Sequence, residues 1–170
     1  PGAAAPTLIV HPPHAASGFD SQRIIYVRRA NRLEYFAHSE WADPPARMLA
    51  PLLVLALEDT GAFAAVVLTP SAAAGEFRID TELLRLQHDF GPAPSQVRLT
   101  LRATITDNGN RRILAWREFD ATVVAASEDP YGGVIAANQA VHSVLEQVAA
   151  FCAETVGRAR PAATVSRPGT

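Results

Sequence analysis

The sequence contains one cysteine, no lysine and no long hydrophobic run, and each scarcity excludes a class of protein. Cys152 is alone among 170 residues, so neither an internal disulfide nor a zinc site of several cysteines can form. All 15 basic residues are arginine, and a formal net charge of −2 gives no positive excess for binding nucleic acid. The uncharged run at residues 62–75 is shorter than the roughly 20 residues that span a bilayer, so no membrane-crossing helix is expected.

Motifs of common catalytic sites are also missing. The sequence has no Gly-x-Ser-x-Gly element, phosphate-binding glycine loop or dinucleotide fingerprint. His11-Pro12-Pro13-His14 is the only paired-histidine motif, and its prolines prevent a helical metal-binding face, so we interpret it as a rigid, extended exit from a strand. We therefore predict a protein with no catalytic residues, no metal ligands and no cofactor.

Two groups of titratable residues keep an enzymatic alternative open. His88-Asp89 could act as an acid–base pair, and Asp80 and Glu82, two residues apart, would share one face of a strand. Neither group has a nucleophile in a recognisable context beside it. A small soluble enzyme that uses His88 and Asp89, or the strand carboxylates, is the alternative to a binding protein.

The composition is that of one globular domain, since 48% of the residues are apolar and 19% are charged. Residues 1–6 and 157–170 show no hydrophobic period, and we expect a flexible leader and a flexible tail there. Residues 7–156 form the single predicted domain.

Alternating apolar residues predict seven strands. They lie at residues 7–11, 23–29, 33–37, 63–69, 77–86, 97–105 and 111–125. The run at 63–69 is apolar throughout and predicts a central strand covered on both faces. A one-residue change of phase near Leu83-Leu84 predicts a bulge.

The turn at residues 107–110 predicts a hairpin with a three-residue loop. This register places Ile105 opposite Ile113 and keeps apolar side chains facing one another across the strands. Arg117, which would lie opposite Leu101, is its polar exception.

The first predicted helix spans Asp43 to Thr60. Asp43 is suited to the N-cap, Pro44 to the first turn, and Gly61 to a left-handed end. The apolar stripe that we expect to be buried is Leu49, Leu52, Leu53, Ala56 and Leu57. Pro51 interrupts this helix and predicts a kink.

The second predicted helix follows Asp129-Pro130, which repeats the same cap-and-proline device. Its apolar face includes Val144, Val148 and Cys152, so Cys152 is interpreted as a small buried hydrophobic residue. Tyr131-Gly132-Gly133 at the helix start could hold an anion, but close packing is the simpler explanation.

The order of three strands, a helix, four strands and a helix predicts an α/β fold. We expect a single layered domain, a mixed β-sheet of about seven strands packed with two main helices. The strand at 63–69 should enter parallel to an earlier strand through a right-handed crossover.

An aromatic strand that runs into a helix start is the most distinctive segment. It reads Tyr35-Phe36-Ala37-His38-Ser39-Glu40-Trp41-Ala42-Asp43-Pro44-Pro45. A strand hairpin, a Tyr-x-x-x-x-x-Trp-Ala-(Asp/Glu)-Pro segment and a Leu-rich helix together resemble the auxiliary lipoprotein component of ABC-type transporters. These proteins accompany lipid transport systems with mammalian-cell-entry (MCE) domains in Gram-negative envelopes.

The resemblance implies a non-catalytic auxiliary subunit of an ABC/MCE-type lipid transport system. Such a subunit would face the periplasm and be tethered at the outer membrane through a lipid-bearing cysteine upstream of Pro1. Its partners would be an MCE-domain protein and the ABC transporter complex, with a homo-oligomer as a further possibility and no nucleic acid. A divergent nucleic-acid module is a third hypothesis, because the fold resembles anticodon-binding domains, but the acidic charge balance argues against it.

The turn between the second and third strands is a local basic feature. It reads Arg28-Arg29-Ala30-Asn31-Arg32 and lies near Tyr26, Tyr35 and Phe36. It is either a solvated hairpin tip or a docking surface for a partner or for anionic lipid head groups, since arginine with aromatic residues is typical of interfaces. The candidate surface consists of Arg28, Arg32, Tyr35 and Phe36.

Overall fold

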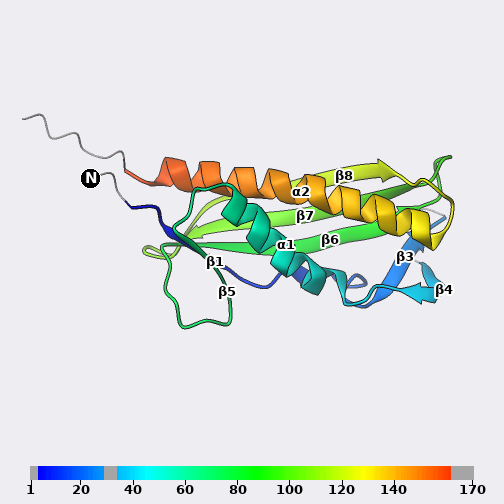
Figure 1. The fold of residues 1–170 in the computed structure, drawn as a ribbon, viewed down its shortest axis with the longest axis horizontal. Helices are drawn as coiled ribbons and strands as arrows, with labels where there is room; N and C mark the ends of the chain where they lie inside the picture. The colour runs from blue at the N-terminus through cyan, green and yellow to red at the C-terminus, as the bar shows by residue number, and fades with distance from the viewer. Residues whose placement is uncertain (1–3, 29–33, 162–170) are drawn as a thin grey trace, which may run out of the picture.

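A computed structural model describes residues 4–28 and 34–161. It has two layers, an eight-stranded mixed sheet and two helices that lie across one face of that sheet (Figure 1). The elements in chain order are β1 (Thr7–Val10), β2 (His14–Ala15), β3 (Arg23–Val27), β4 (Glu34–Glu40), α1 (Pro45–Asp59), β5 (Ala65–Leu68), β6 (Phe77–Asp89), β7 (Gln96–Asp107), β8 (Arg112–Val124) and α2 (Pro130–Ala159). The predicted α/β class is confirmed, and the short β2 is the strand that the sequence did not predict.

The thirteen-residue strand β6 organises the sheet. Along one edge it pairs antiparallel with β7, which pairs in turn with β8. Along the other edge it receives β1, β2 and β3 one after another, all parallel. β5 lies outside β1, and β4 lies outside β3. The chain therefore does not leave the sheet at Pro12-Pro13, because His14 pairs again with β6 opposite Glu82.

β5 departs from its predicted place in the sheet. Its parallel pairing with β1 is as expected, but it lies at an edge, where Ala65 and Leu68 are exposed. The prediction of a central strand covered on both faces is wrong. A short apolar run has no alternation to report which face is covered, so periodicity alone does not separate a central strand from an edge strand.

The bulge in β6 is confirmed, since its register with β7 shifts between Leu83 and Arg85. The predicted register of the β7–β8 hairpin is wrong. Four residues, not three, join the two strands. Ile105 consequently lies opposite Ala115, and Arg117 lies opposite Ala103.

Local hydrogen bonds explain the longer β7–β8 turn. The Asp107 carboxylate accepts the N–H of Gly109 at 2.8 Å, and Arg111 takes a left-handed φ of 59°. A register shift beside the turn absorbs the extra residue. Arg117 is tolerated on the helix-covered face because its guanidinium stacks 4.7 Å from the Phe151 ring centroid.

α1 begins one residue later than its sequence signals suggest. Pro44 is the N-cap, with no side-chain cap bond, so the predicted Asp43 cap is wrong. Asp43 instead forms a 3.9 Å ion pair with Arg47. Gly61 closes the helix with φ of +68°, as predicted. Leu52 is a correction to the expected buried stripe, because it is 46% exposed.

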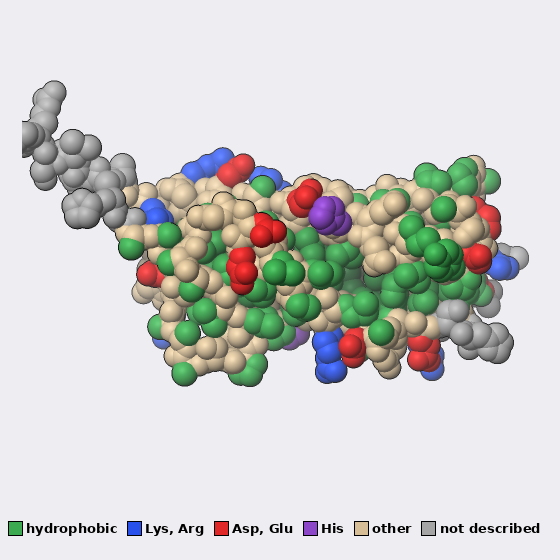
Figure 2. Space-filling model, in the orientation of Figure 1, with side chains coloured by type: hydrophobic (Ala, Val, Ile, Leu, Met, Phe, Trp, Pro, Cys, Tyr) green, Lys and Arg blue, Asp and Glu red, His purple; other side chains and the backbone are tan. Residues whose placement is uncertain are grey.

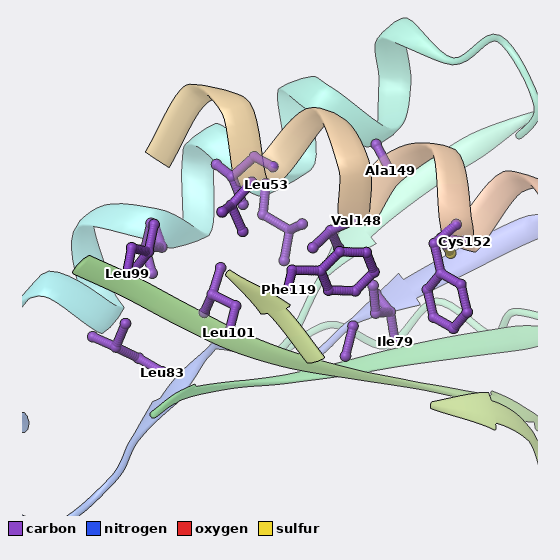
Figure 3. Close-up of a cluster of buried hydrophobic side chains, with 14 of the residues drawn as sticks. Leu53, Ile79, Leu83, Leu99, Leu101, Phe119, Val148, Ala149 and Cys152 are labelled. Atoms are coloured by element: carbon purple, nitrogen blue, oxygen red, sulfur yellow. The ribbon is translucent and has the colours of Figure 1, made fainter. Parts of the chain in front are cut away.

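α2 starts as predicted, with the Asp129 carboxylate accepting the Gly132 N–H at 2.8 Å. It continues through Gly157 to Ala159. The core lies between the helices and the sheet, where Leu53, Val148 and Cys152 meet strand residues such as Ile79 and Leu101 (Figure 3). Cys152 is fully buried as expected, and burial raises the pKa of its thiol to about 12.

Candidate partner-binding site

The β3–β4 hairpin carries a cluster of aromatic rings at its base. The Tyr26 and Phe36 ring centroids lie 4.6 Å apart, and the Phe90 ring meets Tyr26 edge-on at 6.0 Å. The Arg28 guanidinium lies 5.4 Å from the Tyr26 centroid and 5.8 Å from that of Phe90. Arg28 is exposed. An arginine held on aromatic rings keeps its donors free for a partner, because stacking uses the face of the guanidinium rather than its N–H groups.

The structure brings together two of the four residues of the predicted docking surface. Arg28 and Phe36 belong to one cluster through Tyr26. Arg32 lies outside the described residues. Tyr35 pairs with Ile25 in the sheet, but its side chain lies outside the described part of the chain.

Phe90 is the member of this cluster that sequence reasoning missed. Phe90 directly follows β6, and nothing in its local sequence connects it to the hairpin. The signal that could have found it is the parallel pairing of β3 with β6, which places Val27 beside Asp89. That pairing belongs to the tertiary structure, and no local sequence pattern predicts it.

His88 lies beneath the aromatic cluster. It is 2% exposed, and its ring centroid lies 4.1 Å from that of Phe90. Its Nε2 shares a 2.7 Å hydrogen bond with Ser95 Oγ, whereas its Nδ1 has no hydrogen-bond partner among the described atoms. Burial lowers the pKa of His88 because it penalises the charged imidazolium, although Glu128, Asp129 and Asp89 oppose this shift.

Two glycines let α2 approach this histidine. A Cβ on Gly133 would lie 2.6 Å from His88 Nδ1, and a Cβ on Gly132 would collide with the Ser127 backbone. The Tyr131-Gly132-Gly133 segment therefore serves close packing, as the simpler interpretation predicts.

Glu128 attaches the β6–β7 loop to the start of α2, and Asp129 caps that helix. The Glu128 carboxylate accepts the Ser95 N–H at 2.9 Å, and this hydrogen bond lowers the pKa of Glu128. The Asp129 carboxylate accepts from the Ser127 hydroxyl and the Gly132 N–H, which lower the pKa of Asp129. The buried histidine, the loop and the helix start thus form one anchored base for the hairpin.

The candidate acid–base residues do not form a catalytic arrangement. His88 bonds to Ser95, while the Asp89 carboxylate accepts the N–H of Gly91 at 3.0 Å. Ser95 is fully buried, so its hydroxyl is sealed from a substrate. The pairing of His88 with Asp89 is therefore not realised.

The strand carboxylates are engaged in ion pairs on the sheet face opposite the helices. Asp80 lies 2.8 Å from His11 Nδ1 and 2.9 Å from Arg78 Nε. Glu82 lies 3.6 Å from Arg102. Within residues 4–28 and 34–161, no group of three or more His, Cys, Asp or Glu side chains is arranged to hold a metal ion. No helix in the same ranges is both long and apolar enough to traverse a bilayer.

A groove between α1 and α2 is a second candidate surface. It has a volume of about 630 Å³ and an apolar wall that includes Leu52, Leu55 and Val141, with Asp59 and Glu146 at its rim. Figure 2 shows hydrophobic side chains along the middle of this face with acidic side chains and a histidine beside them. Met48, Leu52 and Leu55 are 37%, 46% and 55% exposed, so one edge of α1 is left without a partner. These residues recur at i, i+4 and i+7, which is a helical period, but of the three only Leu52 was part of the predicted buried stripe.

Comparison with known proteins identifies relatives of this fold. The family of ABC-type transport auxiliary lipoprotein components matches residues 1–149. A crystal structure of a Xanthomonas campestris protein of the DUF330 family is 25% identical, with a TM-score of 0.83, over 92% of this chain and 88% of that one. A hypothetical protein from Chlamydia trachomatis is 12% identical, with a TM-score of 0.54, over 88% of this chain and 98% of that one, and shares the fold alone. No protein with a curated description matches the chain.

Proposed function

This chain belongs to the family of ABC-type transport auxiliary lipoprotein components, and we propose from that premise that it is a non-catalytic subunit of an MCE-type lipid transport system. The subunit would face the periplasm, tethered at the outer membrane by an upstream lipid anchor. The observation that carries the proposal is the family match over residues 1–149. The burial of His88 and Ser95, which share a 2.7 Å hydrogen bond, supports a packing role for the histidine.

The proposed contact with the MCE-domain protein is the β3–β4 hairpin, with Arg28, Arg32, Tyr35 and Phe36 as its candidate residues. Arg28 supports this assignment, because it is exposed and held in place by two rings. Phe36 would act differently, because its ring packs on Tyr26 and Phe90. A substitution of Arg28 should therefore change binding without disturbing the fold.

The transport role is tested with the lipidated protein in a Gram-negative cell. The protein should fractionate with the outer membrane and co-purify with an MCE-domain protein. Fractionation with the cytosol, or the absence of any MCE-domain protein from the purified complex, contradicts the proposal.

The hairpin is tested by the double substitution Arg28→Glu and Arg32→Glu. It should weaken co-purification while changing stability by no more than about 0.5 kcal/mol for each residue, as is usual for surface positions. Arg158→Glu is the matched control, because Arg158 is also exposed but lies at the end of α2. If the double variant still co-purifies with the MCE-domain protein, the contact with that protein lies elsewhere. If the variant instead loses only its binding to anionic lipid vesicles, the hairpin binds lipid head groups.

The enzymatic alternative is tested at its two named residues. His88→Gln and Asp89→Ala should leave envelope function intact wherever the protein remains folded. Loss of function in a folded variant of normal thermal stability would favour the enzyme, because a packing role predicts lost stability instead.

A further inference from the structure

The β3–β4 hairpin is attached to one end of the sheet by a short contact (Figure 1). Tyr26 and Val27 pair with β6, and β4 pairs only with β3 among the described strands. Ile24, Ile25 and Val27 are buried, yet they lie outside the cluster of buried residues that joins α1, α2 and the long strands. A unit that shares little core opens at a lower free energy than the whole fold. The hairpin can therefore separate from β6 while the rest of the molecule stays folded.

His88 lies where this attachment is made. It pairs with Tyr26 across the sheet, and its ring centroid lies 6.2 Å from that of Phe36 and 4.1 Å from that of Phe90. The rings of Tyr26 and Phe36 contact each other in turn. The strand pairing and the ring contacts of the hairpin thus meet at one titratable side chain.

The site suits a neutral imidazole and not a charged one. A neutral ring can leave Nδ1 without a hydrogen, whereas a protonated ring carries an N–H donor on both nitrogens. His88 Nε2 has Ser95 Oγ at 2.7 Å, but Nδ1 has no acceptor among the described atoms. The backbone of Gly133 closes the Nδ1 side, since a Cβ there would come within 2.6 Å. Protonation would therefore bury both a charge and an unpaired donor, and each costs free energy.

There is little room for water to solvate that donor. The void beside the ring has a volume of about 10 Å³, which is the lower limit for one water molecule. Apolar side chains such as Ile24, Trp41 and Ala137 line most of it, whereas a buried water needs about two to four polar partners. A proton on His88 is therefore accommodated only after the ring reaches solvent.

Burial lowers the pKa of His88 from its ordinary value of 6.5 even though three carboxylates oppose the shift. They are Glu128 and Asp129 at the start of α2 and Asp89 at the end of β6. Each already accepts a backbone N–H within 3.0 Å, and none is hydrogen-bonded to the ring. Their attraction does not supply the acceptor that Nδ1 lacks.

The hairpin itself brings a positive charge to the same rings. The Arg28 guanidinium lies 5.8 Å from the centroid of Phe90, the ring on which His88 stacks. A protonated His88 would place a second cation against that ring, and a nearby like charge disfavours the charged form. Separation of the hairpin from β6 removes this repulsion and exposes the imidazole.

We infer that the β3–β4 hairpin is a flap that opens from β6 when His88 takes up a proton. Opening moves Tyr26 and Phe36 away from His88 and detaches Arg28 from Phe90. The consequence for binding rests on the proposed function: acid should weaken the contact assigned to Arg28 and release the partner.

A single proton sets the size and the sign of the effect. The open hairpin binds the proton more readily, because its histidine has the ordinary pKa of 6.5 and the closed one has a lower pKa. The ratio of open to closed hairpin should therefore rise up to about tenfold between pH 7.5 and pH 5.5.

The test is hydrogen–deuterium exchange of the purified chain, measured by mass spectrometry at the two pH values. Protection factors, which correct for the pH dependence of chemical exchange, should fall up to about tenfold in the β3 and β4 peptides. Residues 144–152 of α2 should remain protected on the same timescale, because the opening is local. Hairpin exchange no faster than that of α2 would show global unfolding and overturn the inference.

Three variants separate the proton from the packing. His88→Gln removes the titrating group, so hairpin protection should be the same at both pH values. Ser95→Ala removes the hydrogen bond to the neutral ring but leaves His88 titratable, so protection should be lower throughout and still fall with acid. His38→Gln removes the other histidine of the hairpin and should behave as the parent. If His88→Gln fails to fold, the parent, Ser95→Ala and His38→Gln still decide.

Parent protection that is equal at both pH values, or a pH dependence lost in His38→Gln or retained in His88→Gln, would also overturn the inference. Co-purification tests the consequence: the parent should hold an MCE-domain protein more weakly at pH 5.5, and His88→Gln equally at both pH values. A hairpin that opens with acid in a chain that binds no MCE-domain protein contradicts only the proposed function. Binding of that protein by a chain whose hairpin ignores pH contradicts only the flap.

Discussion

The buried His88 should make stability depend on pH. Its pKa is lowered from the ordinary value of 6.5 in the folded protein, mainly by burial. The unfolded chain then binds the proton more readily, so the stabilisation is fully present above about pH 6.5 and is lost as the pH falls below that value. We expect a lower thermal midpoint at pH 5.5 than at pH 7.5 and a flatter profile in His88→Gln.

The two carboxylates beside His88 act in a lower pH window. Glu128 and Asp129 have pKa values lowered from 4.5 and 3.8, so their contributions are lost at lower pH. His142 is exposed on α2, and His142→Gln is the control that should keep the parent profile. If the dependence of the thermal midpoint on pH is unchanged in His88→Gln, protonation of His88 is not the cause of the lost stability.

A side chain at Gly133 should destabilise the fold. Its Cβ would lie 2.6 Å from His88 Nδ1, and overpacking of this kind costs about 1–3 kcal/mol. Gly133→Ala should therefore lower the denaturant midpoint. Gly157→Ala is the control, because Gly157 also lies in α2 but has open space around it. Alanine at this position should stabilise the fold by about 0.4–1 kcal/mol.

At the residue scale, the sequence predicts which side chains are buried better than it predicts which side chains contact one another. The burial of Cys152 follows from the apolar face of α2, since a helical period is a local property. The bond between His88 and Ser95 does not follow from any period, because it depends on how the β6–β7 loop folds over the strand end. Exposure of Leu52 was missed for a related reason, since a stripe marks the apolar side of a helix but not how much of it a neighbour covers.

Among the elements, α1 contains a proline in its interior. Pro51 lies inside Pro45–Asp59, where an interior proline removes one backbone hydrogen bond and costs about 3 kcal/mol. The predicted kink at this residue stays a prediction. Pro51→Ala should raise the thermal midpoint and straighten the helix, as measured by calorimetry and a structure of the variant. If both stay unchanged, the proline was never strained.

Strands were predictable where their side chains alternate. β6 and β7 alternate because one face meets the helices and the other carries charged and polar residues, and the bulge in β6 appears as a change of phase. The position of β5 and the β7–β8 register were wrong because they depend on neighbours. In the hairpin, the hydrogen bonds that the Asp107 carboxylate accepts from the Gly109 and Asn110 N–H groups favour the longer turn over apolar matching across the strands.

The molecule as a whole should unfold in one step. A single cluster of buried residues joins α1, α2 and the sheet, so neither helix has a separate core. Trp41 packs against that cluster, whereas Trp116 is 62% exposed on the opposite sheet face. Fluorescence of Trp41 in a Trp116→Phe variant and far-ultraviolet circular dichroism should give the same midpoint. Separate midpoints would show two cooperative units.

The fold class was predictable from the order of elements, since long strands with two amphipathic helices leave few layered arrangements. The hairpin surface was predicted from its arginines and aromatic residues, but the contact of Phe90 with Tyr26 requires β3 beside β6. The groove could not be predicted, because it requires the spacing of two helices that are distant in sequence.

The arrangement of β6 also sets the order in which a growing chain can fold. β1, β2 and β3 each pair with this one strand, and Val27 cannot pair with Asp89 until residue 89 has been synthesised. At a synthesis rate of about 5–20 residues per second, the roughly sixty intervening residues take about 3–12 s to emerge. During that interval the β3–β4 hairpin and the β1–β5 pair can form, but the strand that joins them is missing, so the sheet cannot close and the inner edges of both pairs stay open to any factor that binds the growing chain.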